Sequence, residues 1–163
     1  MRRAADGMAP LGKWWGYVPA SVGVATWILA AEHGRSEQRS RRAGAVAMVA
    51  AATIAAGAAR LFDDVLPQPP APPGHRSRHK PVFPSGHAFG TGSVAMTAAY
   101  ILEREGLILP GSAVALALGV PLLSAGGKLV EEKHWGSDVL GGLLAAVMLS
   151  SACVTAYELA GDA

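Results

Sequence analysis

The sequence predicts an all-α protein, an integral-membrane bundle of about five transmembrane helices. Three observations support this fold class. Apolar residues make up 51% of the chain, charged residues make up only 16%, and the charges cluster and leave long uncharged runs between them. A soluble globular protein carries about 25% charged residues, so this chain is poor in charge.

Five segments lack Lys, Arg, Asp and Glu over lengths close to the roughly 20 residues that a helix needs to cross a bilayer. The second of them is short and extends past Arg60, and the third becomes continuously apolar only from Ala88. Their many Ala, Gly, Ser and Thr residues suit close helix packing in lipid. A soluble bundle is the alternative, but it would need charged residues along a wet face, which these segments lack. The segments are Trp14–Ala31, Ala43–Ala59, Pro81–Leu102, Gly106–Gly127 and Val139–Tyr157.

Length and composition also bear on the number of domains, a signal peptide, nucleic-acid binding and the single cysteine. We expect one membrane-embedded domain over residues 1–163, because this length does not provide two independent cores. No apolar core with a cleavage site follows the N-terminal Met-Arg-Arg, so no removable signal peptide is expected. A net charge of +2 without a basic stripe excludes nucleic acid as an expected partner. The single cysteine, Cys153, lies in an apolar run and should pack as a small hydrophobic residue.

Two of the connections between these segments carry histidines. The stretch LPQPPAPPGHRSRHKPVFPSGH, which ends at His87, is predicted to be an extended connection, because proline cannot continue a helix. The connection KLVEEKHWGSD, which ends at Asp138, is shorter and also carries lysine and histidine. With five spans, both connections emerge on the same side of the membrane. The sequence therefore predicts that they meet and form a site at one membrane face.

The residues in these two connections have the chemistry of an anion site. Ser85, Gly86 and His87 stand at an expected helix N-terminus, where free N–H groups and the helix dipole favour an anion. His134 and Asp138 are four residues apart, so the carboxylate can hold one imidazole nitrogen and leave the other as a nucleophile. Two histidines in a cationic pocket suit phosphoryl transfer, in which one attacks phosphorus and the other protonates the leaving oxygen.

We expect neither a metal ion nor another cofactor at this site. Mg²⁺ prefers a cage of hard oxygen ligands, and the sequence offers no cluster of Asp and Glu that would build one. Basic side chains from both connections would instead neutralise the oxygens of the anion.

These motifs resemble those of the type 2 phosphatidic acid phosphatase family, which is related to the vanadium haloperoxidases. That family carries the motifs Lys-x6-Arg-Pro, Pro-Ser-Gly-His and Ser-Arg-x5-His-x3-Asp. The second motif is intact as PSGH at residues 84–87. The third appears as GKLVEEKHWGSD, with His134 and Asp138 at the family spacing, Lys128 at the arginine position and Gly127 at the serine position.

The first motif of the family is degraded in this chain. Arg60 stands at the lysine position if the motif begins at RLFDDVLPQ, but Pro67-Gln68 then replaces Arg-Pro. Alternatively, Lys80-Pro81 replaces Arg-Pro, and Pro73 then stands at the lysine position. The resemblance covers residues 55–145. Known members commonly have six spans, whereas we expect five here.

The resemblance implies a helical bundle whose pocket opens at one membrane surface, and a metal-independent phosphatase of a membrane lipid phosphate. His134 would be the nucleophile that forms a phosphohistidine, His87 the general acid, and Asp138 the residue that orients His134. Lysine provides a point charge where arginine provides a planar fork, so phosphate binding at Lys128 would be tuned differently. The residues implied to hold phosphate oxygens are Ser85, Gly86 and Lys128, helped by Arg76, Arg78, Lys80 or Arg60.

Several alternatives stay open at this point. The substrate could be phosphatidate, phosphatidylglycerol phosphate, or a polyprenyl phosphate or diphosphate. A haloperoxidase that binds vanadate is a second function, but we would expect a larger, soluble chain for it. A catalytically weakened or non-catalytic membrane protein that retains the bundle is a third, and the degraded first motif favours it. The sequence does not specify an oligomeric state.

The orientation in the membrane depends on the basic residues. The side with the histidines carries nine Lys and Arg residues and the opposite side carries five, a distribution that favours a cytoplasmic site by the positive-inside rule. Several of the nine are candidates for phosphate binding, whereas the cluster at Arg35–Arg42 is not. We therefore expect a multi-pass protein of a bacterial-type cell membrane with an extracytoplasmic site.

Overall fold

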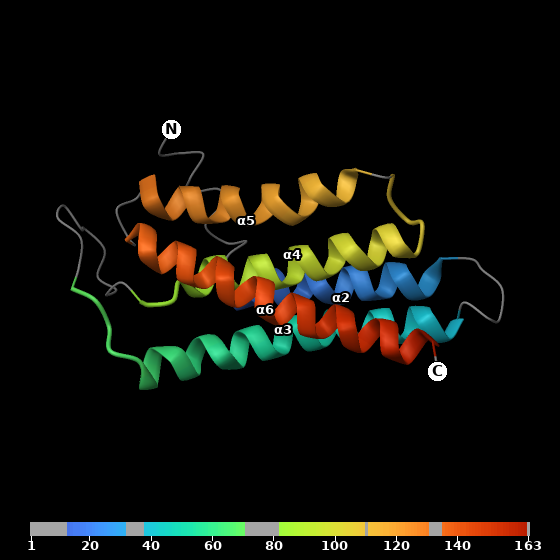
Figure 1. The fold of residues 1–163 in the computed structure, drawn as a ribbon, viewed down its shortest axis with the longest axis horizontal. Coiled ribbons are helices and arrows are strands. Elements are labelled where there is room, and N and C mark those ends of the chain that lie inside the picture. The colour runs from blue at the N-terminus through green and yellow to red at the C-terminus, as the bar shows by residue number, and fades with distance from the viewer. Residues whose placement is uncertain (1–12, 32–37, 71–81, 110, 131–134, 163) are drawn as a thin grey trace.

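The computed structural model describes residues 13–31, 38–70, 82–109, 111–130 and 135–162, and all regular secondary structure in these ranges is helical. The helices lie side by side along the long axis of the molecule (Figure 1). Their number and order confirm the predicted all-α class. They are α2 (Trp14–Ala30), α3 (Gln38–Val65), α4 (Gly86–Arg104), α5 (Ser112–Val130) and α6 (Gly136–Asp162).

Several helix boundaries differ from those of the uncharged segments. Helix α3 continues past its segment at both ends and includes Arg41 and Arg60, because backbone hydrogen bonding does not require apolar side chains. Helix α4 begins only at Gly86, since Pro84 disfavours helical geometry in the residue before it. Helix α5 begins at Ser112, because Gly106 and Gly111 adopt positive φ angles of 67° and 86° and turn the chain.

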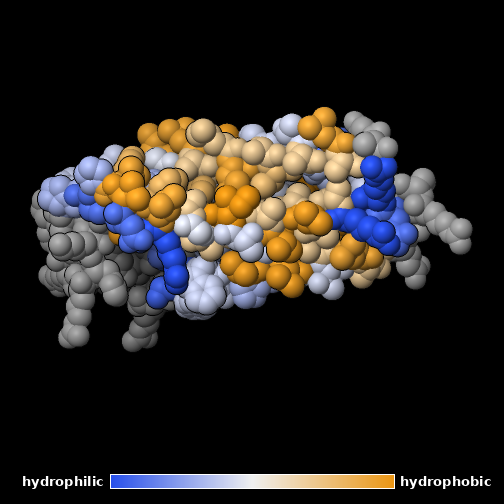
Figure 2. Space-filling view, turned by 90° about the horizontal axis from the view of Figure 1, so that it is seen from below, coloured by the Kyte–Doolittle hydropathy of each residue, from blue (hydrophilic) through white to orange (hydrophobic). Residues whose placement is uncertain are grey.

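The outer surface of the bundle is apolar. Helices α3 and α6 are each long and apolar enough to cross a membrane, yet only 33% and 28% of their most apolar windows are buried. The core helix of a soluble protein would be mostly buried instead. Large hydrophobic side chains such as Val46, Val114 and Met148 are exposed, and Figure 2 shows hydrophobic surface across the middle of one face, with hydrophilic groups at both ends. This distribution fits contact with hydrocarbon.

The interior, in contrast, contains small and hydroxyl-bearing residues. Helix α4 is central and packs against the other four helices. The buried Ser93 hydroxyl donates to the carbonyl oxygen of Phe89 at 2.8 Å, and the buried Thr97 hydroxyl donates to the Ser150 hydroxyl on α6 at 3.2 Å. Small side chains and satisfied hydroxyls of this kind allow helices to associate closely in lipid.

The end of the bundle that carries the C-terminus (Figure 1) is closed by a buried ion pair. Arg41 is 3% exposed, and its Nε lies 3.5 Å from Glu105 Oε2. Its Nη1 donates to the carbonyl oxygens of Ile28 and Ala31 at 3.1 and 2.8 Å. Glu105 also accepts a hydrogen bond from the Tyr157 hydroxyl at 2.6 Å. The network ties α2, α3, α6 and the α4–α5 connection together.

At the opposite end, the starts of α4 and α6 meet. The backbone N–H of Ser85 donates to the carbonyl oxygen of Asp138 at 2.8 Å. The indole Nε1 of Trp135 donates to the carbonyl oxygen of Pro70 at 2.8 Å, so the α5–α6 and α3–α4 connections also touch. For these residues, the structure agrees with the prediction that the two connections lie at one end of the bundle.

Glycines on α6 permit this close approach. A Cβ added to Gly142 would lie 2.6 Å from the backbone oxygen of Ser85, and one added to Gly141 would lie 2.8 Å from the ring of Phe83. Further along the same pair of helices, a Cβ on Gly92 would lie 2.7 Å from that of Ala146. Any side chain at these positions would push α4 and α6 apart.

We predict that Gly142→Ala lowers the free energy of unfolding by about 1–3 kcal/mol, because the new methyl group overpacks against the α4 backbone. The matched control is Gly119→Ala on α5, where a Cβ meets no atom within 4 Å. That variant should be neutral or gain up to about 1 kcal/mol from helix propensity. Thermal unfolding of the detergent-solubilised proteins measures both, and equal melting temperatures would show that α4 and α6 are not in close contact there.

Candidate active site

The N-terminus of α4 forms one part of the candidate site. Ser85 is the N-cap residue, with extended φ and ψ angles of −61° and 111° and no side-chain capping hydrogen bond. Its hydroxyl is fully buried and has no hydrogen-bond partner within the described ranges. The first N–H groups of a helix also lack intrahelical acceptors. An oxyanion at this helix start would supply acceptors for both kinds of donor.

Asp138 connects this helix start to that of α6. Its side chain is 1% exposed, and Oδ2 accepts a hydrogen bond from the backbone N–H of Trp135 at 2.9 Å. Because Trp135 accepts the first backbone bonds of α6, Asp138 caps the helix from its third position. Its carbonyl oxygen meanwhile accepts the N–H of Ser85. The side chain of Asp138 therefore caps α6, while its backbone joins the start of α6 to the start of α4.

A cleft of about 680 Å³ opens beside the start of α4. Three helices line it: the beginning of α2, the end of α3 and the first two residues of α4. The ionisable side chains on its walls are those of two basic residues, a histidine, a tyrosine and one aspartate. The residues that line the cleft are Lys13, Trp14, Trp15, Tyr17, Ala56, Gly57, Ala59, Arg60, Asp63, Gly86 and His87.

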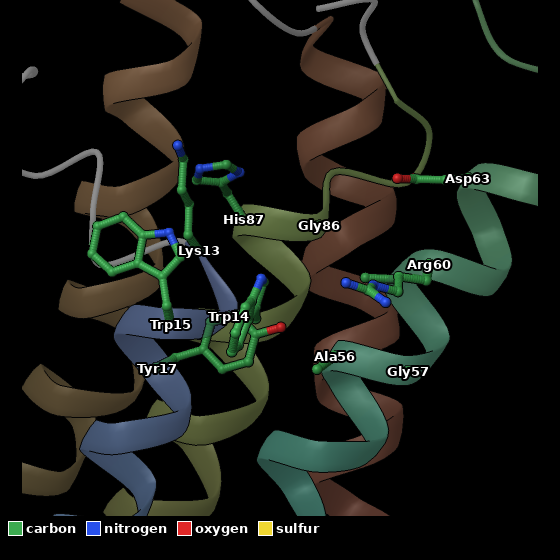
Figure 3. Close-up of a pocket in the computed structure, with 11 residues that line it drawn as sticks. Lys13, Trp14, Trp15, Tyr17, Ala56, Gly57, Arg60, Asp63, Gly86 and His87 are labelled. Atoms are coloured by element: carbon green, nitrogen blue, oxygen red, sulfur yellow. The ribbon is translucent and has the colours of Figure 1, made fainter.

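The basic side chains converge in this cleft (Figure 3). Lys13 and His87 lie beside each other, and the Arg60 guanidinium points into the cleft from α3 on the opposite wall. Asp63, one turn further along α3, also points inward. The cleft therefore offers two permanent cations and an imidazole, a set that can bind and protonate a small oxyanion.

Aromatic contacts beside the cleft hold α2 and α3 against α4. Tyr17 of α2 is 5% exposed and sits against α4 at Gly90, where any side chain would overlap the tyrosine ring. The rings of Phe62 on α3 and Phe89 on α4 lie 5.8 Å apart. These contacts hold α2 and α3 at set distances from α4, so the cleft walls are positioned by buried packing.

The structure brings together some of the residues predicted for the site. Gly86, His87 and Arg60 line one cleft, and Ser85 and Asp138 are joined beside it by their backbone bond. The backbone of Lys128 belongs to the last turn of α5, but its side chain is not among the described ones. The residues that lie outside the described ranges are His134, Arg76, Arg78 and Lys80.

Two charged residues of the cleft were not predicted from the sequence. Lys13 directly precedes α2 and Asp63 lies near the end of α3, and neither belongs to a motif. A signal for Lys13 existed, because the first helix starts on the same side as both histidine-bearing connections. Asp63 had a weaker signal, since it lies three residues beyond Arg60 and so on the same helix face.

No three His, Cys, Asp or Glu side chains in the described ranges lie close enough to hold a metal ion. Residues 131–134 lie outside these ranges, so metal independence stays a prediction. What the described residues offer is positive charge, helix N–H groups and one imidazole.

Comparison with known proteins supports a specific family. The family model described as PAP2 superfamily matches residues 65–162, more than half of the chain. The chain therefore belongs to this superfamily, which confirms the resemblance to the type 2 phosphatidic acid phosphatases. No curated protein and no solved structure matches the chain. Membership indicates a phosphatase-type hydrolase that acts on phosphate esters. The match begins at Val65, so Lys13 and Arg60 lie before it.

We predict that Arg60→Gln weakens the binding of inorganic phosphate by about tenfold or more, because a charge-assisted hydrogen bond is lost. The matched control is Arg39→Gln, at the other end of the same helix and exposed, which should bind phosphate like the wild type. Isothermal titration of the solubilised proteins measures both affinities. Equal phosphate affinity for Arg60→Gln and the wild type would mean that Arg60 does not hold the anion.

Proposed function

We propose that the protein is a metal-independent phosphatase of a membrane lipid phosphate that works through a phosphohistidine at His134. The observation that carries the proposal is the cleft in which His87, Arg60 and Lys13 converge. This cleft lies beside the bond between Ser85 and Asp138, at the end of a bundle with an apolar outer surface. Membership of the PAP2 superfamily supports the reaction class.

The proposed reaction has two steps. First, an imidazole nitrogen of His134 attacks phosphorus, the bond from phosphorus to the lipid oxygen breaks, and protonated His87 donates its proton to that oxygen. The lipid alcohol leaves, and the phosphoryl group stays on His134. Then water attacks phosphorus while His87 takes a proton from it, and the phosphorus–nitrogen bond breaks to release inorganic phosphate. Arg60 and Lys13 neutralise the non-bridging oxygens in both steps.

Asp138 has two functions in this proposal. One carboxylate oxygen caps α6 through the N–H of Trp135 at 2.9 Å. The other orients the imidazole of His134 and stabilises the positive charge that develops on it. Because the carboxylate is buried and held by the helix start, it acts from a fixed position. A fixed acceptor loses no free energy to reorganisation during the reaction.

The surroundings of the cleft favour a lipid as the substrate. Trp14 and Trp15 line the cleft and are 58% and 48% exposed. Tryptophan prefers the membrane–water interface, so these rings would place the mouth of the cleft at the depth of phosphate headgroups. The middle of the bundle is apolar on the face that Figure 2 shows. A substrate can therefore keep its tail in the bilayer while its phosphate reaches His87.

We also propose that the protein is a multi-pass cell-membrane protein with the cleft on the extracytoplasmic side. The exposed Arg39 and Arg42 at the other end of α3 support this orientation through the positive-inside rule. A cysteine introduced at the exposed Asp64 should react with an impermeant maleimide on intact cells. Reaction only after permeabilisation would place the cleft in the cytoplasm.

Two variants test the mechanism. His134→Ala should abolish phosphate release from lipid phosphates, and the wild type should keep its activity in EDTA. Asp138→Asn retains an oxygen that can cap α6 but loses the charge, so turnover should fall by about 100-fold or more with little change in melting temperature. The measurement is phosphate release from phosphatidate, phosphatidylglycerol phosphate and polyprenyl diphosphate in detergent. Full activity of His134→Ala would overturn the mechanism, and full activity of Asp138→Asn would reduce Asp138 to a helix cap.

A further inference from the structure

A second hollow lies on the outer surface of the bundle between α2 and α3, two of the three helices that line the cleft. It has a volume of about 480 Å³ and is lined by one face of α2 and one face of α3. On α2 the lining residues include Val22, Ala25 and Leu29, and on α3 they include Val46, Val49 and Ala50. Because α2 and α3 run antiparallel, the hollow lies between the end of α2 and the first half of α3, away from the end of the bundle that carries the cleft. We call the groove between α2 and α3, from Gly57 to Val46 on α3, the α2–α3 seam.

The cleft and this hollow follow one another along the same face of α3. Thr53 lines the hollow and Gly57 lines the cleft, and residues four apart on a helix are neighbours on one face. A Cβ placed on Gly57 would meet no atom within 4 Å. On α3, no side chain therefore stands at Gly57, between the hollow and Arg60. Arg60 lies at the upper end of the same helical face, in the cleft.

The hollow offers an occupant only apolar contact. Its two polar side chains, Thr26 and Thr53, donate their hydroxyls to backbone oxygens of their own helices, Val22 and Val49, each at 2.9 Å. Val22, Leu29 and Val46 are about half or more exposed, at 48%, 54% and 69%. An occupant with polar groups along its length would lose hydration here without gaining hydrogen bonds.

The length of the seam matches one membrane leaflet. From Gly57 to Val46, α3 rises about 16 Å at 1.5 Å per residue. The hydrocarbon core of a bilayer is about 30 Å thick, so the seam spans about half of it. It runs parallel to the bundle axis, and a lipid tail in that leaflet would have the same direction.

The second apolar groove on α3 shares Val46 and Ala50 with the hollow but lies on the side of α3 that faces α6. It lies between α3 and α6, with a volume of about 290 Å³, and its lining includes Ala43, Ile54, Leu149 and Ala160. Helix α6 contributes no residue to the cleft. This groove therefore does not continue into the place where a phosphate would bind.

We infer that the α2–α3 seam binds the hydrocarbon tail of the lipid phosphate whose headgroup occupies the cleft. The inference rests on the proposed function for the identity of the headgroup, and it adds where the tail lies. The seam accordingly selects long-chain substrates over short, water-soluble phosphates. Its residues contact the tail and not the phosphate, so they affect chain-length preference without taking part in the chemistry.

The test compares Thr53→Trp and Thr26→Trp, whose side chains are exposed and would fill the seam, with Thr155→Trp on α6. Thr155 is also exposed and lies outside both grooves. The probes are octadecylphosphonate and butylphosphonate, which cannot be hydrolysed because a carbon–phosphorus bond replaces the ester bond. Binding is measured by titration calorimetry on the protein in phosphatidylcholine nanodiscs, and phosphate release by the wild type from phosphatidate is measured in parallel.

We expect the two seam variants to lose about tenfold or more in octadecylphosphonate affinity, because the indole takes the place of the tail and the packing contacts of several methylenes are lost, and to bind butylphosphonate within about twofold of the wild type. Thr155→Trp should match the wild type with both probes. Unchanged octadecylphosphonate affinity in the seam variants, equal losses for both probes, or no binding of either probe by the wild type would overturn the inference. Chain-dependent binding without phosphate release would keep the tail site and refute the proposed phosphatase.

Discussion

The contact between the N-termini of α4 and α6 is the constraint on which the site depends. A single backbone hydrogen bond of 2.8 Å, from Ser85 to Asp138, joins two segments that are far apart in the chain. The bond forms because Gly141 and Gly142 leave no side chain between the helices. It places the buried carboxylate of Asp138 beside the helix start that carries His87. The indole of Trp135, which donates to the carbonyl oxygen of Pro70, adds a second link between the same two connections.

The bilayer explains why polar groups gather at the two ends of this bundle. Along its middle, hydroxyls such as those of Ser93 and Thr97 are satisfied inside, and the outer surface is apolar, as lipid requires. The far end is closed by the buried Arg41–Glu105 pair, which ties the helices together. The near end is left open as a cleft. Among the described residues, the Arg41–Glu105 pair therefore holds the bundle together, whereas Lys13, Arg60 and Asp63 line the cleft.

Uncharged runs and topology made the helices and the meeting of the two connections predictable, because the runs mark the spans and two spans separate the connections. The wall formed by α2 and α3 was not predictable in the same way. Lys13 and Asp63 enter the cleft through tertiary packing, in which Tyr17 sits against Gly90, and no motif encodes that contact. The cap that Asp138 provides to α6 depends on where that helix begins, and one buried carboxylate has an oxygen for this cap and another for the proposed orientation of His134.

The most direct test of the account is to trap the covalent intermediate. Wild-type protein would be mixed with a lipid phosphate that carries radioactive phosphorus, quenched in alkali, digested and mapped. The account predicts an alkali-stable, acid-labile label on the peptide that contains His134, and no label in His134→Ala. A turning-over enzyme with no label on any histidine, or with the label on another residue, would contradict it.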